Sequence, residues 1–393
     1  MGEELKLDPR LAAIHAQEYP RFSDAEMARR RTALARVMAE ADVDHLLVSG
    51  EQRAGTGVAW LTGWPTTVEA YVIVSPREPQ VMYVEWYNHW PLAKKLARDT
   101  EVRWGEHRGV DKVIADLRAR GARRIGLMGA LGYTKAKKLE TAFGPLVDLN
   151  RRYVRLRLIK SAEEVDWMRI GAALTDLAIA ALRRHAKPGL TERELGGICE
   201  SAYHPHGGVT YIHFFLVTPM ASPEYCVPRQ LESSRKVQPG DVISTEITAA
   251  FFEYPGQILR TFTVAADPTP LYRRLYETAE AAFDAVTGVI RHGTTMQEII
   301  DAAGLIEDAG FSVYDDLVHG FGGGYFPPVL GTRSRPAGPL PEMTLEAGMT
   351  CVVQPNVITP DEKAGVQVGE LVLVTERGFE RMHGVARGLF RVC

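Results

Sequence analysis

The chain has 393 residues, and its 46 Lys and Arg nearly balance 49 Asp and Glu, so the formal net charge is −3. A chain of this length suits two domains that each bury a core. The balanced charge provides no basic surplus for nucleic acid or an anionic membrane surface. A small-molecule substrate is therefore expected rather than a nucleic acid or membrane partner.

Cysteine usage and the start of the chain bear on the compartment. The four cysteines are widely spaced and form no Cys-x-x-Cys pair, which disfavours a disulfide framework or structural zinc. The first residues are acidic and lack the apolar core of a signal peptide, and no apolar run reaches the length of a membrane span. We expect a cytoplasmic protein.

The first part of the chain alternates helical and strand-like segments. Ser23 and Glu26 form a capping-box pattern that predicts a helix to about Glu40. Apolar runs predict strands at residues 44–49, 70–74, 80–84 and 124–128, with a helix near 110–120. This alternation predicts a mixed α/β domain over residues 1–154.

The second part opens with another capping box. Ser161 and Glu164 predict the start of a long helix, and Thr191 with Glu194 predicts the next. Further helices are predicted at residues 269–291 and 295–309, and strands at 241–247, 257–264, 350–355 and 370–375. These elements form a second domain, residues 155–393.

Four short segments carry or adjoin these strands: Glu246–Gln257, His319–Gly322, Gln354–Asn356 and Gly365–Glu370. In order and spacing they resemble the active-site segments of the pita-bread family, which contains methionine and proline aminopeptidases, prolidases and creatinase. The stretches Val58–Gly63 and Arg155–Glu164 also resemble parts of the creatinase and prolidase chains. The resemblance implies an α+β fold: a pita-bread C-terminal catalytic domain and a smaller mixed α/β N-terminal domain. It also implies a homodimer in which the N-terminal domain reaches the partner's cleft.

The metallopeptidases of this family hold two metal ions with five ligands, and the resemblance assigns those positions to Glu246, Gln257, His319, Gln354 and Gly369. Two carboxylates are thus replaced by amides and one is lost, unless the neighbouring Glu370 turns inward. Neutral amide oxygens are weak substitutes for carboxylates at hard divalent ions. We therefore expect a retained scaffold without a metal centre, and no cofactor.

The position of His319 makes it the first candidate for acid–base catalysis, since the glycines after it let backbone pass close to a substrate. The alternative is a hydrogen-bonded structural histidine. Glu246 could activate water or bind a cationic group, or it could be a surface carboxylate of the strand. Gln257 and Gln354 would position the substrate and stabilise an oxyanion.

Other residues are candidates for substrate binding. Arg229 stands where proline peptidases carry a histidine, and it could hold a carboxylate with two hydrogen bonds. Leu259 replaces the substrate-binding Glu of creatinase, which makes creatine an improbable substrate. His213 could line the cleft, and zinc binding with His204 and His206 is disfavoured because no carboxylate supports it. The remaining candidates are aromatic residues that could wall a pocket or belong to the core: Tyr254, Tyr325 and Phe326.

These observations predict a metal-independent, creatinase-like hydrolase that cleaves a C–N bond of a small, carboxylate-bearing substrate. Two alternatives stay open. One is a catalytically silent binding protein, since loss of ligands accompanies loss of activity. The other is a metal-dependent Xaa-Pro dipeptidase or aminopeptidase that holds one ion with Glu246, His319 and Glu370.

Overall fold

The computed structural model describes residues 4–51 and 56–393. They form two compact units: an N-terminal unit of residues 16–157, and a C-terminal unit that combines residues 4–15 with 158–393. The expected boundary after residue 154 falls inside helix α7 (Asn150–Leu158), near whose end the units divide. Helix α1 (Pro9–His15) packs on helix α8 of the C-terminal unit (Ala162–His185). The acidic start of the chain predicts no signal peptide, and its residues 1–3 lie outside the described residues.

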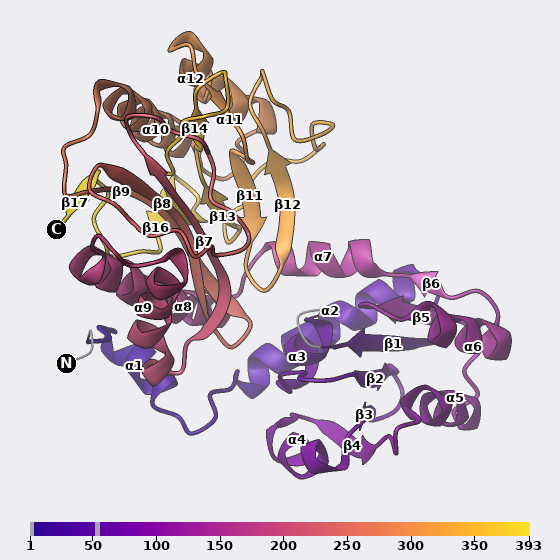
Figure 1. Ribbon diagram of the computed structural model, residues 1–393. Coiled ribbons are helices and arrows are strands. Elements are labelled where there is room, and N and C mark those ends of the chain that lie inside the picture. Colours follow the sequence, from indigo (N-terminus) through magenta and orange to yellow (C-terminus); the bar gives the residue numbers. More distant parts are fainter. Residues whose placement is uncertain (1–3, 52–55) are drawn as a thin grey trace. The chain divides into compact units, whose positions relative to one another are not determined.

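The N-terminal unit contains a six-stranded mixed sheet in the order β4-β3-β2-β1-β5-β6 (Figure 1). Its strands are β1 (His45–Gly50), β2 (Ala70–Val74), β3 (Gln80–Val84), β4 (Thr100–Trp104), β5 (Ile125–Met128) and β6 (Val147–Asp148). Its helices besides α7 are α2 (Asp24–Glu40), α3 (Gly57–Thr62), the 3-10 turn Tyr87–His89, α4 (Trp90–Leu96), α5 (Gly109–Ala119) and α6 (Tyr133–Phe143). The four predicted strands of this region and its two predicted helices are confirmed.

Strand β1 is buried along its whole length because both faces of the sheet are covered. Leu46 and Val48 lie in one core cluster with side chains of α2, and Leu47 lies in the other with side chains of α5. A strand that is covered on both faces has a nearly continuous apolar sequence, and β1 follows this pattern. Helix α2 begins where predicted, since the Ser23 hydroxyl accepts a hydrogen bond from the Glu26 amide at 3.1 Å.

The C-terminal unit is built on a large, mostly antiparallel sheet whose main path is β12-β11-β13-β15-β9-β8-β7 (Figure 1). Its strands are β7 (Val209–Pro219), β8 (Asp241–Phe251), β9 (Tyr254–Val264), β11 (Val318–Phe321), β12 (Tyr325–Leu330), β13 (Thr350–Val353) and β15 (Gly369–Val374). Strands β16 (Phe379–Arg381) and β17 (Phe390–Val392) pair with β15 and β9, and β10 (Ser312–Val313) pairs with β14 (Val357–Ile358). The four predicted strands of this region are confirmed, and the fold is the predicted pita-bread architecture.

Helices pack on this sheet. They are α8, α9 (Glu192–Tyr203), the 3-10 turn His204–His206, α10 (Pro270–Val289), α11 (Met296–Ala302) and α12 (Leu305–Asp308). Complete capping boxes start α8 at Ser161 and α9 at Thr191, as predicted. The single helix predicted at residues 295–309 is instead two, α11 and α12, separated at Gly304.

Helix α8 lies very close to β9. A Cβ at Gly171 would stand 2.3 Å from the carbonyl oxygen of Tyr254, and a Cβ at Gly256 would stand 2.3 Å from Cα of Ala172. Two glycines therefore allow the helix and the strand to touch backbone to backbone. This contact also fixes the faces of β9: Gly256 and its alternate neighbours face the helix, and Gln257 faces away from it.

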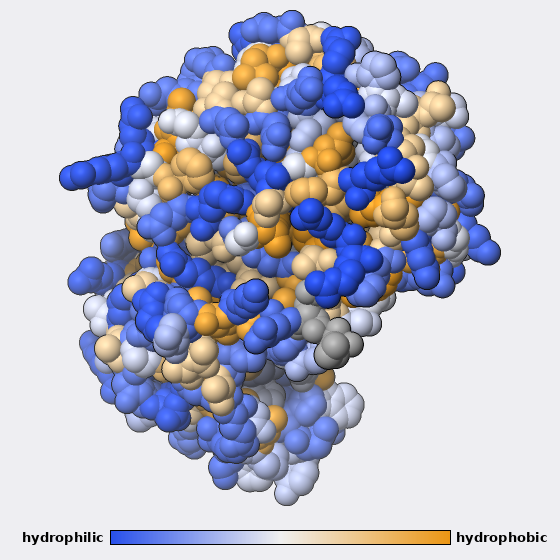
Figure 2. All heavy atoms as spheres, turned by 90° about the vertical axis from the view of Figure 1, so that its left-hand side faces the viewer, coloured by the Kyte–Doolittle hydropathy of each residue, from blue (hydrophilic) through white to orange (hydrophobic). Residues whose placement is uncertain are grey.

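The surface carries no extended apolar region on the face shown in Figure 2, where hydrophobic residues form small groups among hydrophilic ones. Within the described part of the chain, every helix is too short or too polar to cross a membrane.

Candidate functional site

Glu246 and Gln257 meet on the face of the sheet that points away from α8. Strands β8 and β9 pair so that Thr248 lies opposite Gln257 and Glu246 opposite Leu259. Gln257 Nε2 donates a hydrogen bond of 2.7 Å to Glu246 Oε1 and a longer one, 3.4 Å, to Gln354 Oε1 at the end of β13. Three of the predicted site residues thus form one hydrogen-bonded group.

His319 lies on β11, beside this group. It pairs with Val352 of β13, and its ring stacks on that of Tyr325, with centroids 4.2 Å apart and planes 17° apart. The Nδ1 atom lies 3.3 Å from the carbonyl oxygen of Gly320, which can only accept, so Nδ1 carries the proton and Nε2 is the basic nitrogen. His319 is 1% exposed. Burial lowers its pKa to about 4, against the opposing effect of hydrogen bonds to Gly320 and Gln354.

Glu246 is 8% exposed, and its carboxyl is held in the protonated form. Burial raises its pKa to about 8, and the nearby carboxylates of Asp315 and Asp316 raise it further. Burial likewise raises the pKa of Asp315. The usual order of a glutamate and a histidine is therefore reversed: at neutral pH the proton resides on Glu246, and His319 is neutral.

Two further carboxylates, Asp315 and Asp316, act on Glu246 and were not predicted from the sequence. They lie between β10 and β11, and two hydrogen bonds fix this segment: the Tyr314 amide donates to Asn356 Oδ1 at 3.2 Å, and the Gln354 amide donates to the Leu317 carbonyl at 2.9 Å. Asp316 Oδ2 also accepts a hydrogen bond from the Tyr325 hydroxyl. The sequence feature that could have indicated these residues is a pair of adjacent carboxylates a few residues before His319.

Two predicted residues point away from this group, because side chains alternate along a strand. His213 pairs with Ile247, so it shares the opposite face from Glu246, where Tyr203 Oη lies 3.1 Å from its Nε2 and burial lowers its pKa to about 4. Tyr254 donates a hydrogen bond of 2.9 Å to Glu164 of α8. The structure does not bring either residue to the site face.

Glu370 also lies on the opposite face. It is fully buried and bound by Arg260 at 2.7 Å and by Arg381 of β16. The ion pairs with these arginines hold its pKa below the usual value despite burial. Gly369, its neighbour, faces the site: a Cβ there would stand 3.1 Å from Cβ of Gln354. The inward turn of Glu370 considered above does not occur.

Arg229 and Phe326 have partners elsewhere. Arg229 Nη2 donates a 2.6 Å hydrogen bond to the buried carboxylate of Glu192, which neutralises its charge. Phe326 is buried, and the ammonium of Lys160 lies 5.0 Å from its ring centroid. The neighbouring Tyr325 is the aromatic residue that reaches His319.

The donor set does not fit the two divalent ions of the metallopeptidases. Of the five positions that the resemblance assigns to ligands, Glu246 and His319 can supply a carboxylate and an imidazole, Gln257 and Gln354 supply neutral amides, and Gly369 supplies nothing. The environment of Glu246 also favours its uncharged form. Across residues 4–51 and 56–393, no three His, Cys, Asp or Glu side chains are grouped to hold a metal ion.

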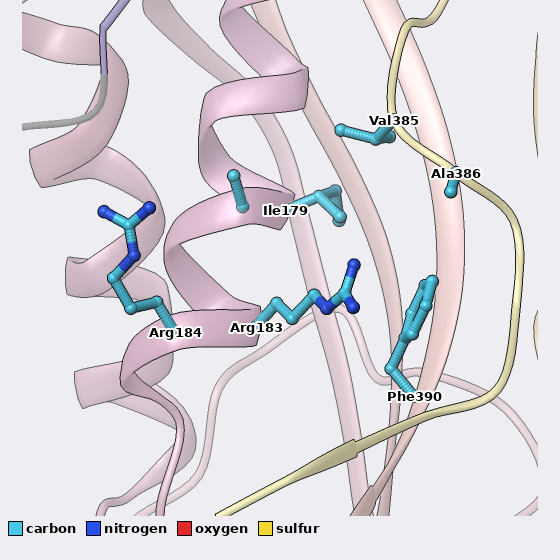
Figure 3. Close-up of a pocket in the computed structure, with 7 residues that line it drawn as sticks. Ile179, Arg183, Arg184, Val385, Ala386 and Phe390 are labelled. Carbon is cyan, nitrogen blue, oxygen red and sulfur yellow. The ribbon is translucent and has the colours of Figure 1, made fainter.

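A separate pocket of about 520 Å³ lies on the helix side of the sheet, between α8 and the C-terminal segment (Figure 3). Arg183 extends toward Phe390, with its guanidinium carbon 3.9 Å from the ring centroid. None of the residues of the hydrogen-bonded group lines this pocket. It therefore does not belong to the candidate active site.

Comparisons with known proteins agree with the fold. Residues 166–376 match Metallopeptidase family M24, and residues 30–159 match the Creatinase/Prolidase N-terminal domain. A Xaa-Pro dipeptidase of Pyrococcus furiosus is 22% identical over 370 residues, which cover 92% of this chain and 100% of the relative. A probable dipeptidase PepE of Mycobacterium bovis is 27% identical over 229 residues, 57% of this chain and 58% of the relative.

Two solved structures extend this similarity to the whole fold. The Xaa-Pro dipeptidase from Bacillus anthracis superposes with a TM-score of 0.80 at 20% identity, covering 93% of this chain and 100% of its own. The prolidase from Pyrococcus horikoshii superposes with a TM-score of 0.79 at 20% identity, covering 92% and 99%. Since the family match spans more than half of the residues, the chain belongs to Metallopeptidase family M24 and carries a creatinase/prolidase-type N-terminal domain.

Proposed function

We propose that this protein is a hydrolase that cleaves an amide-type C–N bond by acid–base catalysis with Glu246 and His319. Family membership supports a peptidase-type hydrolase. The observation that carries the proposal is the burial of Glu246 and His319 at the two ends of the Gln257–Gln354 hydrogen bonds, which raises the pKa of Glu246 to about 8 and lowers that of His319 to about 4. Two titratable groups whose environments push their pKa values apart are suited to the separate roles of acid and base.

In this proposal the neutral imidazole is the base. A water molecule attacks the carbonyl-type carbon, and Nε2 of His319 accepts the proton that the water loses. The stacked Tyr325 ring and the Gly320 carbonyl hold the imidazole in place.

Glu246 is the acid. Its carboxyl carries a proton at neutral pH and transfers it to the nitrogen as the C–N bond breaks, so that water is consumed and an acid and an amine are released. Gln257 holds this carboxyl through the 2.7 Å hydrogen bond from its Nε2, and Gln354 supplies a neutral amide for the developing oxyanion. The carboxylate-binding role expected for Arg229 is not part of the proposal, because Glu192 already binds its guanidinium.

A metal-dependent Xaa-Pro dipeptidase is the second candidate, and the names of the relatives favour it. Elemental analysis by plasma mass spectrometry, before and after dialysis against manganese, cobalt and zinc, separates the two. Small amides, ureas and Xaa-Pro dipeptides are then tested with and without chelator. Turnover that resists chelator and is lost in His319→Ala supports the proposal. Stoichiometric metal with chelator-sensitive dipeptide cleavage would overturn it, and absence of any turnover would favour a binding protein.

A further inference from the structure

We propose that the site binds a positively charged nitrogen group of its ligand, such as an ammonium, guanidinium or amidinium, between the carboxyl groups of Asp315 and Asp316 and the ring of Tyr325, next to Glu246. The inference deepens the proposed function, and it rests on that function only for the statement that the ligand is the substrate. It also reverses the expectation of an anionic group at this site.

The first observation is an uncompensated cluster of carboxyl groups. Glu246 is buried, and Asp315 and Asp316 are partly buried. The charges that act on Glu246 come from the two aspartates, and no Lys or Arg within the described ranges forms an ion pair with any of the three. His319, which stacks on Tyr325, has a pKa lowered to about 4 by burial and supplies no positive charge at neutral pH. Glu246 carries a proton at neutral pH, but the two partly buried aspartates lack a cation, and a ligand cation would offset the cost of their desolvation.

The second observation is independent of charge. Gln257 is 1% exposed, and its Oε1 is buried without a hydrogen-bond partner, although its Nε2 is bonded to Glu246. Turning the amide over would leave Nε2 in that place instead, so one polar atom stays unpartnered in either orientation. Thr248 Oγ1, across the strand pair from Gln257, is buried and unpartnered too. Buried polar atoms are nearly always paired, so these two atoms are available to accept hydrogen bonds from a ligand.

The third observation concerns the aromatic side chain beside the carboxyl groups. Tyr325 stacks one ring face on His319 and donates its hydroxyl to Asp316, yet 53% of the residue is exposed. An aromatic face next to carboxylates favours a cation through the ring quadrupole as well as through charge. An N–H donor of such a cation would also satisfy Gln257 Oε1. An anion would meet repulsion from the same carboxyl groups.

The test compares two probes of nearly the same shape that differ in charge, methylguanidinium chloride and methylurea. Each is titrated calorimetrically into the full chain at pH 7.5 and equal ionic strength. We expect methylguanidinium to bind at least ~10-fold more tightly, and Asp315→Asn or Asp316→Asn to weaken it about fivefold while leaving methylurea unchanged. Asp308→Asn, at an 80% exposed side chain on α12, is the matched control and should have no effect.

The outcomes separate this inference from the proposed function. Equal binding of the two probes, or no effect of the aspartate variants, would overturn the cation site whether or not the protein turns over an amide. Tight Mn²⁺ binding that displaces methylguanidinium would also overturn it, by assigning the carboxylates to a metal. Selective cation binding without any turnover would support the site and count against the hydrolase alone. Far-UV circular dichroism of each variant verifies that it is folded.

Discussion

Gln257 donates a hydrogen bond to Glu246 across strands β8 and β9, from Nε2 to Oε1 at 2.7 Å. In the metallopeptidases that the chain resembles, these two positions are both acidic and share metal ions. Here an amide takes the second position, so the carboxyl of Glu246 gains a neutral hydrogen-bond partner instead of a like charge. The donated hydrogen bond alone would favour the ionised carboxylate, but burial and the charges of Asp315 and Asp316 outweigh it and raise the pKa of Glu246 to about 8.

Replacing Glu246 by Gln should abolish the acid and reduce kcat by about 10²–10⁴, the usual contribution of a positioned acid or base. The amide keeps the size of the side chain and can still bond to Gln257, so KM should change little. The measurement is steady-state kinetics on whichever amide the screen identifies. Glu342→Gln, at an exposed glutamate remote in the sequence, is the control. Activity equal to that of the unmodified protein would remove Glu246 from the mechanism.

The pKa of Glu246 also predicts how stability depends on pH. The folded state keeps a proton up to about pH 8 that the unfolded chain releases near 4.5, so the free energy of unfolding falls as pH rises through this window. The slope is at most ~1.4 kcal/mol per pH unit for one group. His319 and His213, with pKa values lowered to about 4, act in the other direction, since they reduce stability as pH falls below about 6.5.

Between pH 7 and 8 these two histidines are largely unprotonated in both states, so their contribution to the pH dependence is small. Urea unfolding measured there should show stability decreasing with pH in the unmodified protein, and a smaller decrease in Glu246→Gln. Parallel pH profiles of the two proteins would mean that Glu246 is ionised in the folded state. The acid role would then have to be abandoned.

Local sequence signals predicted the elements well, but not which face each side chain takes. Patterns of neighbouring residues predicted the capping boxes at Ser161 and Thr191 and the strands around Glu246 and Gln257. The strand predicted from Gln257 in fact starts at Tyr254, and an odd separation of three residues puts these two on opposite faces. The same alternation separates Gly369 from Glu370.

The acidic pair escaped prediction for a different reason. Asp315 and Asp316 are placed by contacts with residues distant in the chain, since Asn356 and Gln354 hold the backbone on either side of them. No periodic pattern or short motif marks such a segment. Its proposed role depends on the lack of an ion pair with Lys or Arg in the described part of the chain, which only the packed structure can reveal.

Gly369 is predicted to tolerate no side chain. A Cβ would stand 2.5 Å from the Val353 carbonyl oxygen and 2.8 Å from Cα of Gln354, and both are backbone atoms that cannot turn aside. Gly369→Ala should lower the free energy of unfolding by about 1–3 kcal/mol, as overpacking does. Gly378→Ala is the control, because nothing lies within 4 Å of a Cβ there. Equal urea midpoints for the two variants would show that β13 and β15 can separate to admit a ligand side chain.

The sequence made both Tyr254 and Tyr325 candidates for a pocket wall, but their contacts in the structure predict different roles. Tyr254 is buried and donates to Glu164 at 2.9 Å, so Tyr254→Phe should cost about 1–3 kcal/mol of stability while kcat and cation binding stay unchanged. Tyr325 is half exposed and donates to Asp316, so Tyr325→Phe should change stability little but alter binding of methylguanidinium, because Asp316 loses the donor that orients it. Urea unfolding measures the stability of both variants, and calorimetric titration measures their binding of methylguanidinium. If Tyr254→Phe weakened cation binding while Tyr325→Phe did not, the site would lie on the face of β9 that packs on α8, and the assignment of Glu246, Gln257 and Asp316 to one group would be wrong.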